Sequence, residues 1–151
     1  MESVIIHKYR MIKTSWGIAI DIYGRVCDYD VLGDNKIFLE NVVKICDEIS
    51  ILFLPDKNEK VGPNESYNQM HPDDYHYLLE GLKKVSQDIL RYTKYKNTLI
   101  IINRMEYNLC DFQEEGIVAG IMEWAAKAFG FESPKIEAIY QKEVNRYIYK
   151  F

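Results

Sequence analysis

The stretch that decides the fold is Phe112–Phe129, FQEEGIVAGIMEWAAKAF. Its apolar residues occupy nearly every side of a helix, so we expect a helix that is buried almost all round. Gly116 and Gly120 lie one turn apart and leave a strip without side chains, although each glycine costs about 1 kcal/mol relative to alanine inside a helix. Close packing of this strip on a sheet or on another helix is the interpretation we favour. Asp111 and Glu114 resemble a capping box that would start the helix.

A helix buried in this way needs sheet partners, and the neighbouring sequence predicts strands. Residues 98–103 (TLIIIN) are apolar and β-branched and predict a central strand near 98–104. At the C-terminus, residues 136–141 and 146–151 are interpreted as a hairpin. A single helix over 135–151 is the alternative, because the apolar residues there also fit helical spacing.

The N-terminal residues predict an antiparallel meander. Strands are expected at 4–11 and 16–23, and in the second strand isoleucines alternate with smaller or polar residues. Gly24 and Arg25 are then a plausible tight turn into a third strand at 26–31.

The middle of the chain predicts two helices separated by a polar loop. Asp34 and Asn35 would cap a helix over 36–48, and residues 49–54 (ISILFL) fit either its last turns or a separate buried strand. The loop is at 56–70, and a clear apolar stripe predicts a helix over 72–93 that opens with Pro72. With 151 residues, the fold class that follows is one α+β domain with a mainly antiparallel sheet and about three helices.

The sequence lacks residues that several known types of metal, nucleophile and phosphate sites require. An EF-hand loop starting at Asp28 would place Gly33 correctly, but Leu32 and Leu39 stand where two calcium ligands are needed. The spacing between His71 and His76 is five residues, whereas a zinc helix needs four. No nucleophile elbow or phosphate-binding glycine loop is present. We therefore predict no metal site and no cofactor.

The three cysteines, Cys27, Cys46 and Cys110, lie far apart and form no CxxC pair. Buried, reduced thiols of a cytosolic protein are the simplest interpretation. The N-terminal residues lack the pattern of a signal peptide, and no apolar run is long enough to cross a bilayer. We accordingly expect a cytoplasmic protein with no membrane contact.

Charge is distributed unevenly along the chain. The formal net charge is −4, but residues 21–80 hold thirteen acidic residues against five basic ones, a local balance of −8. Such a segment would repel nucleic acid and attract a basic protein. The basic stretch Arg91–Lys96 is interpreted as a solvated helix face rather than a nucleic-acid site. The residues predicted to bind the partner are Asp28, Asp30, Asp34, Asp56, Glu59, Glu65, Tyr67, Asp73 and Asp74.

An immunity-type inhibitor that neutralises a basic, nuclease-like toxin domain fits this charge map. Twelve tyrosines, six phenylalanines and two tryptophans could supply aromatic anchors for such an interface. The alternative from the residues themselves is an enzyme whose site is dispersed in sequence, with His7 or His76 acting beside Asp21 or Glu114. We favour the inhibitor and expect no catalytic residue.

A second alternative comes from a resemblance. The run 110–124, CDFQEEGIVAGIMEW, followed by residues 136–151 resembles the C-terminal part of 4-vinyl-reductase-like ligand-binding domains, which share a segment near a cysteine, a GxxxG helix and a final strand pair. The resemblance covers about a quarter of the chain and implies a small-molecule sensor. The later cysteines of that family are absent here, and the N-terminal strands do not match it.

Overall fold

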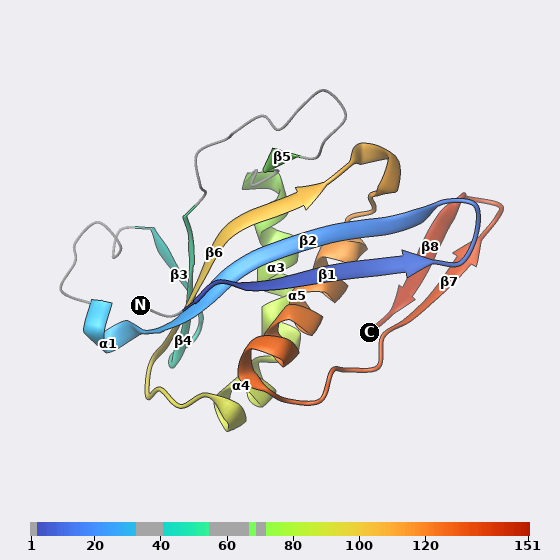
Figure 1. Ribbon diagram of the computed structural model, residues 1–151. Helices are drawn as coiled ribbons and strands as arrows, with labels where there is room; N and C mark the ends of the chain where they lie inside the picture. The colour runs from blue at the N-terminus through green and yellow to red at the C-terminus, as the bar shows by residue number, and fades with distance from the viewer. Residues whose placement is uncertain (1–2, 33–40, 55–66, 69–71) are drawn as a thin grey trace.

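Helix α5 (Glu115–Phe129) lies across one face of a sheet and is buried along most of its length, as its composition predicts (Figure 1). Gly116 and Gly120 allow the backbone of α5 to approach the sheet closely. A β-carbon added to Gly116 would lie 2.7 Å from Ile18, and one added to Gly120 would lie 3.2 Å from Ile22. The predicted packing of the glycine strip on the sheet is therefore confirmed. The helix ends at Gly130, whose φ of 82° is easily reached only by glycine.

The computed structural model describes residues 3–32, 41–54, 67–68 and 72–151 and shows an α+β fold. Its main sheet has the order β1-β2-β6-β4-β3, with β6 in the middle. In that order the strands are β1 (Ile5–Ile12), β2 (Gly17–Asp28), β6 (Thr98–Tyr107), β4 (Ile49–Phe53) and β3 (Val42–Cys46). Among the strand pairs that the structure describes, only β4 and β6 run parallel; the short β5 (Tyr67–Asn68) pairs with the end of β6. The predicted central strand is confirmed.

The predicted turn at Gly24 and Arg25 is wrong, because β2 continues through both residues. The register with β6 shifts between Tyr23 and Gly24, so the irregularity in sequence marks a bulge and not a reversal. Glycine is required there for packing, since an added β-carbon would lie 2.7 Å from the Trp124 ring. The expected third strand is the end of β2, followed by a helical turn, α1 (Tyr29–Leu32).

The prediction of a helix over 36–48 is wrong for residues 41–48, the part of this range that the structure describes. Val42–Cys46 forms β3, which pairs antiparallel with β4 through a turn at Asp47 and Glu48. Residues 33–40, including the expected cap, lie outside the described residues. The β-branched side chains of this segment fit a sheet as well as a helix, and β4 supplies a partner that the sequence pattern could not reveal. The ambiguous residues 49–54 are therefore mainly strand.

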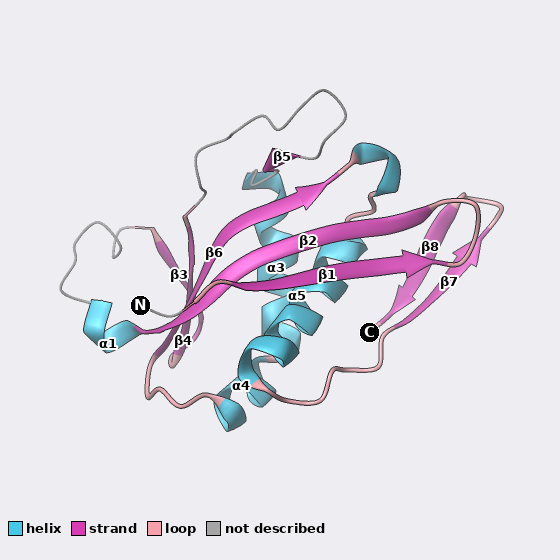
Figure 2. Ribbon diagram, viewed as in Figure 1, coloured by secondary structure: helices cyan, strands magenta, loops and turns pink. Residues whose placement is uncertain are grey.

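The helix predicted over 72–93 is divided in two. Helix α3 (Pro72–Lys84) and helix α4 (Ser86–Tyr92) meet at Val85, whose φ of −109° and ψ of 12° interrupt the helix. Leu82 and Ile89 both remain buried on either side of the break, which lets each segment keep its apolar side in the core. Helices α3, α4 and α5 lie on the same side of the sheet (Figure 2).

The C-terminal hairpin is confirmed as β7 (Glu137–Gln141) and β8 (Arg146–Lys150). It is held by Gln113, whose side-chain amide donates to the Tyr147 carbonyl at 2.6 Å and accepts from the Tyr147 amide at 2.9 Å. The predicted capping box is wrong. Asp111 lies in a 3-10 turn (Leu109–Asp111), Phe112 is extended with a φ of −136° and a ψ of 138°, and α5 begins only at Glu115.

The cysteines are free, but only Cys27 is buried; Cys46 is half-buried and Cys110 is exposed. The expectation of three buried thiols is therefore wrong for Cys110. Among the described helices, none has both the length and the apolar character needed to cross a bilayer.

Replacing Gly81 with alanine tests the contact between α3 and α5. Its β-carbon would lie 2.2 Å from Ile121 and 2.7 Å from the Val118 carbonyl oxygen, so a backbone shift is required. We expect G81A to lower the free energy of unfolding by about 1–3 kcal/mol. G120A, which meets only side chains at 3.2 Å or more, is the matched control and should change stability less. Equal stabilities in urea titrations would contradict this packing.

Alkaline pH tests the contact between the buried Tyr9 of β1 and Tyr149 of the hairpin. The Tyr9 and Tyr149 hydroxyls are hydrogen-bonded at 2.7 Å, and burial raises the pKa of Tyr9 from 10.0 to about 12. The unfolded chain loses this proton near pH 10, whereas the folded chain retains it. Stability is therefore complete below pH 10 and declines as the pH rises towards 12, by about 2–3 kcal/mol for Tyr9. Y9F should show a shallower decline than Y92F; parallel pH profiles would contradict the assignment.

Candidate protein-binding surface

The acidic residues predicted to form one binding surface are separated by the fold. Asp28 is paired with Thr98 at the start of β6, whereas Asp74 is bonded to Tyr107 at its end. Ten strand residues separate the two groups by about 30 Å. Asp34, Asp56, Glu59 and Glu65 lie outside the described residues, and Tyr67 is placed only as part of β5, opposite Tyr107.

The sequence predicts that Asp74 binds the partner, but in the structure Asp74 is buried and is not available at the surface. Only 7% of the residue is exposed, and its carboxylate accepts a hydrogen bond of 3.0 Å from the Tyr107 hydroxyl. Burial is the main cause that raises the pKa of Tyr107 well above its ordinary value, and the hydrogen bond to the Asp74 carboxylate is the second cause. Asp73 is exposed in the first turn of α3, where the helix dipole favours a negative charge.

The Tyr107 hydroxyl should stabilise the fold through Asp74. We expect Y107F to lower the free energy of unfolding by about 1.5–3 kcal/mol, because the buried carboxylate loses a donor. Y92F removes a hydroxyl from a half-exposed ring and should stay within about 0.5 kcal/mol of the wild type. Chemical denaturation measures both variants, and a neutral Y107F would exclude a structural role for this bond.

The remaining predicted residues, Asp28 and Asp30, lie together at one end of the sheet. The Asp30 amide donates to the Asp28 carboxylate at 3.0 Å, and the Asn97 side chain donates to Asp30 at 3.1 Å. Glu48 lies at the same end of the sheet but on the other side of β6, where its carbonyl accepts a hydrogen bond from the Thr98 amide. Lys94 and Lys96 occupy the adjoining loop, so the described charge at this end is mixed rather than strongly acidic.

The face of the sheet opposite the helices carries a different group of charges. Ile18, Ile20 and Ile22 point towards the helices, so the alternating residues of β2 point the other way. Cross-strand pairing places residues of β1 and β6 beside them. We call this group the open-face cluster; it consists of Lys8, Arg10, Asp21, Tyr23, Arg25, Arg104 and Glu106.

Ordered contacts hold the open-face cluster. Arg10 donates to Asp21 at 2.8 Å, and Arg25 donates to the Asn103 side chain at 3.2 Å. Arg104 makes an ion pair with Glu106, and its guanidinium lies 5.5 Å from the centre of the Tyr23 ring. Desolvation, then the nearby Glu106 and Asp21, raises the pKa of Tyr23.

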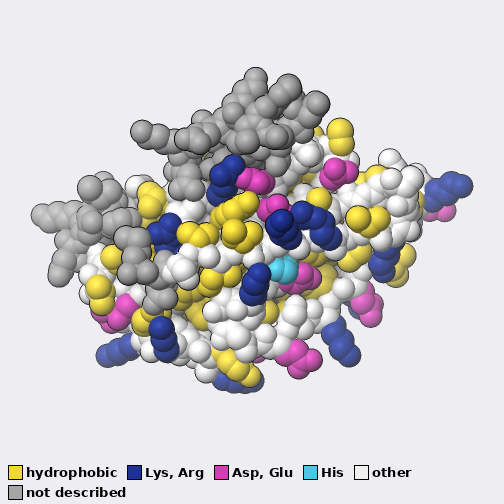
Figure 3. All heavy atoms as spheres, in the orientation of Figure 1, with side chains coloured by type: hydrophobic (Ala, Val, Ile, Leu, Met, Phe, Trp, Pro, Cys, Tyr) yellow, Lys and Arg dark blue, Asp and Glu magenta, His cyan; other side chains and the backbone are white. Residues whose placement is uncertain are grey.

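Counted among its own seven residues, the open-face cluster has a formal excess of positive charge. Four cationic side chains face two carboxylates, and each carboxylate is already paired with an arginine. Figure 3 shows lysine and arginine side chains interspersed with acidic ones across the middle of this face. One end of the face is closed by apolar packing: Tyr29, Leu32 and Val42 cover Cys27, Leu52, Leu99 and Ile101.

The dispersed catalytic pairs considered from the sequence are not assembled. His7 faces the helices and its Nε2 is 2.9 Å from Glu123, whereas Asp21 is on the open face and is bonded to Arg10. His76 is exposed on α3, and Glu114 is paired with Arg146 at 3.0 Å. A hydrogen bond from its own backbone, and next the hydrogen bond from Arg146, lowers the pKa of Glu114. Within the described ranges, no three metal-ligating side chains gather.

Sequence reasoning missed the open-face cluster. Its signal was present, because Lys8 and Arg10 in β1, and Asp21, Tyr23 and Arg25 in β2, all alternate with residues that point inward. The false turn at Gly24 hid the continuity of the pattern. No protein-family model matches this chain, and no curated protein matches it at a significant level.

Proposed function

We propose that this protein is an immunity-type inhibitor that binds a partner protein through the open face of the sheet. The observation that carries the proposal is the open-face cluster, a group of charged and aromatic side chains on the sheet face opposite α3, α4 and α5. An inhibitor of this kind acts by covering its target and needs no catalytic group of its own.

Preorganisation supports binding at this face. The side chains stand on three adjacent, hydrogen-bonded strands, and ion pairs between neighbouring residues restrict their rotamers. Less conformational entropy is therefore lost when a partner orders them. Arginine and tyrosine, which the cluster contains, are also the residue types that most often dominate binding energy at protein interfaces.

The net charge of the open-face cluster indicates which kind of partner surface would be complementary to it. An excess of cations at the centre of the face fits carboxylates on the partner, which would speed association at low salt. The basic partner predicted from the sequence would instead meet Asp28 and Asp30 at the end of the sheet. The two docking modes call for opposite substitutions, so one set of variants distinguishes them.

The product of the gene adjacent to this one in the native host is the partner to test, because inhibitors are usually encoded beside their targets. The double variant K8E/R25E should weaken binding at least about tenfold at low salt, because two cations are lost and two like charges are added. The matched control K83E/K135E makes the same charge change at exposed positions outside the cluster and should bind within about threefold of the wild type.

The thermal unfolding midpoint of each variant should equal that of the wild type, so that a change in affinity does not reflect a loss of folding. Unchanged affinity of K8E/R25E, together with loss of binding in D28K/D30K, would move the interface to the acidic end of the sheet. D73K is the control for that pair, since Asp73 is exposed at the opposite end. Absence of any complex with the neighbouring product would overturn the inhibitor role.

A further inference from the structure

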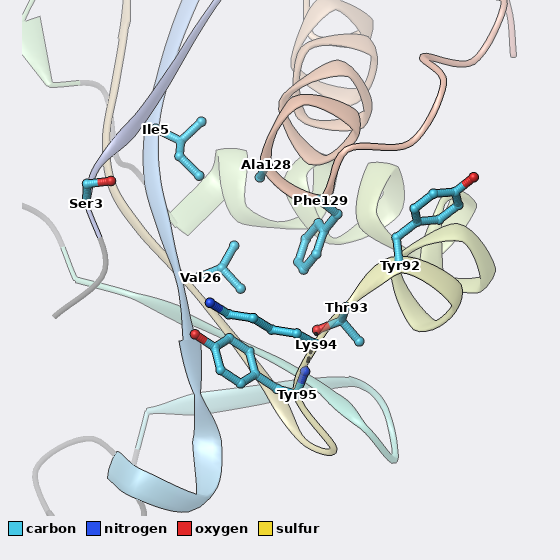
Figure 4. Close-up of a pocket in the computed structure, with 9 residues that line it drawn as sticks. All are labelled: Ser3, Ile5, Val26, Tyr92, Thr93, Lys94, Tyr95, Ala128 and Phe129. Carbon is cyan, nitrogen blue, oxygen red and sulfur yellow. Dashed lines mark hydrogen bonds between the residues drawn. The ribbon is translucent and has the colours of Figure 1, made fainter.

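The cavity shown in Figure 4 offers little for the specific recognition of a ligand. It lies between the end of α5 and the loop that follows α4, and its volume is about 260 Å³. Lys94 and Tyr95 border it, but both already have contacts within the protein, so neither is available to a ligand. The stretch 91–96 is not one solvated helix face as the sequence predicts, because α4 ends at Tyr92 and the next residues border this cavity.

A cleft at the base of the C-terminal hairpin brings together three separate segments of the chain. Its volume is about 290 Å³. The segments are the loop between β1 and β2, the residues that precede α5, and the turn and first residue of the hairpin strand β8. The side chains that line the cleft are Trp16, Cys110, Phe112, Gln113, Asn145 and Arg146.

The apolar walls of the cleft are two half-buried aromatic rings, each held in place by other rings. Trp16 packs edge-on against Tyr147, with the ring centres 5.1 Å apart, and against Tyr140. Phe112 stacks on Tyr107 at 3.9 Å, so one of its faces is covered and the cleft borders the remainder of the ring. A flat apolar body placed against these rings would be removed from water, which favours binding.

The polar groups that this cleft can offer to a ligand are hydrogen-bond donors. The Asn145 Oδ1 accepts a hydrogen bond of 3.0 Å from the Trp16 indole, so the other end of the amide, Nδ2, is a donor. Arg146 bonds Glu114 at 3.0 Å and Glu115 at 3.3 Å, and both bonds use Nη2. Among the described residues, no partner bonds Asn145 Nδ2 or the Nε and Nη1 of Arg146. A ligand of the cleft should therefore present an acceptor.

The charge beside the cleft disfavours an anionic acceptor. Arg146 is paired with both Glu114 and Glu115, so one cation stands against two carboxylates. Hydrogen bonds from its own backbone and from Arg146 lower the pKa of Glu114, which keeps that carboxylate ionised in neutral solution. Asp111 adds a further negative charge next to Cys110 in the chain. A carboxylate ligand would be repelled here, whereas an uncharged carbonyl oxygen would not.

We propose that this cleft binds a flat, uncharged aromatic carbonyl compound of the carboxamide type. The ring of the ligand lies against Trp16 and Phe112, and its carbonyl oxygen accepts hydrogen bonds from Asn145 Nδ2 and Arg146. The volume is just below the roughly 300–1,000 Å³ of drug-sized sites, so it suits one ring with a short substituent. None of the lining residues belongs to the open-face cluster, so the site does not depend on the proposed inhibitor role.

The probes are benzamide and its anionic isostere benzoate, titrated into the isotopically labelled protein. The chain has two tryptophans, Trp16 in the cleft and Trp124 buried in the core, so NMR gives one indole signal for the site and one as an internal control. We expect benzamide to shift the Trp16 indole signal saturably and to leave that of Trp124 in place. Benzoate should bind at least about fivefold more weakly, because the carboxylates of Glu114 and Glu115 repel it.

Cys110 provides a second readout. Its thiol is exposed and lines the cleft, whereas the half-buried Cys46 lies in β3, outside it. Bound benzamide should slow alkylation of Cys110 by iodoacetamide and leave the rate at Cys46 unchanged. An unchanged rate at Cys110 under saturating benzamide would contradict binding in the cleft.

One variant and a matched control complete the test. N145D keeps an oxygen that can accept from Trp16 but removes the N–H donors, and aspartate tolerates the left-handed φ of 51° at this position. It should weaken benzamide binding at least about fivefold. N108D makes the same change at an exposed asparagine outside the cleft and should bind like the wild type.

An unshifted Trp124 indole signal in both variants ensures that the core remains folded. The proposal is overturned if the Trp16 signal does not saturate, if benzoate binds as tightly as benzamide, or if N145D and N108D bind benzamide equally well.

Discussion

The close contact between α5 and the sheet is the constraint on which the rest of the structure depends. Gly116 and Gly120 bring the helix onto Ile18 and Ile22, and Gly81 brings α3 onto α5. The residues of β2 and β6 that face α5 form the larger core. Because side chains alternate along a strand, the intervening residues lie on the opposite face, where Cys27, Leu99 and Ile101 form a smaller apolar cluster at one end. The open-face cluster occupies the remaining part of that face.

Parts of the fold could be predicted because their signals are local. The composition of α5, the β-branched run of β6 and the alternation in the C-terminal hairpin each identify an element without knowledge of its neighbours. Strand β3 could not be predicted in this way, since the residues of Val42–Cys46 suit a helix or a strand and only pairing with β4 decides between them. Gly24 was misinterpreted as a turn because its purpose, space for Trp124, arises from tertiary packing.

The candidate site was less predictable than the fold. Charge counted along the chain placed Asp28, Asp30, Asp73 and Asp74 in one acidic segment, yet β6 separates them by its full length and Asp74 is buried against Tyr107. The open-face cluster joins Lys8, Asp21 and Glu106, which are remote in sequence and meet only through strand register. Register depends on long-range pairing, so a charge map of the linear sequence could not reveal it.

Lysine labelling in the presence and absence of the partner tests the central claim most directly. Lys8 lies in the open-face cluster, whereas Lys83 is exposed on the helix side of the molecule. If the partner docks on the open face, acetylation of Lys8 by a water-soluble reagent slows markedly in the complex while that of Lys83 is unchanged. Protection of Lys83 with continued labelling of Lys8 would contradict the account.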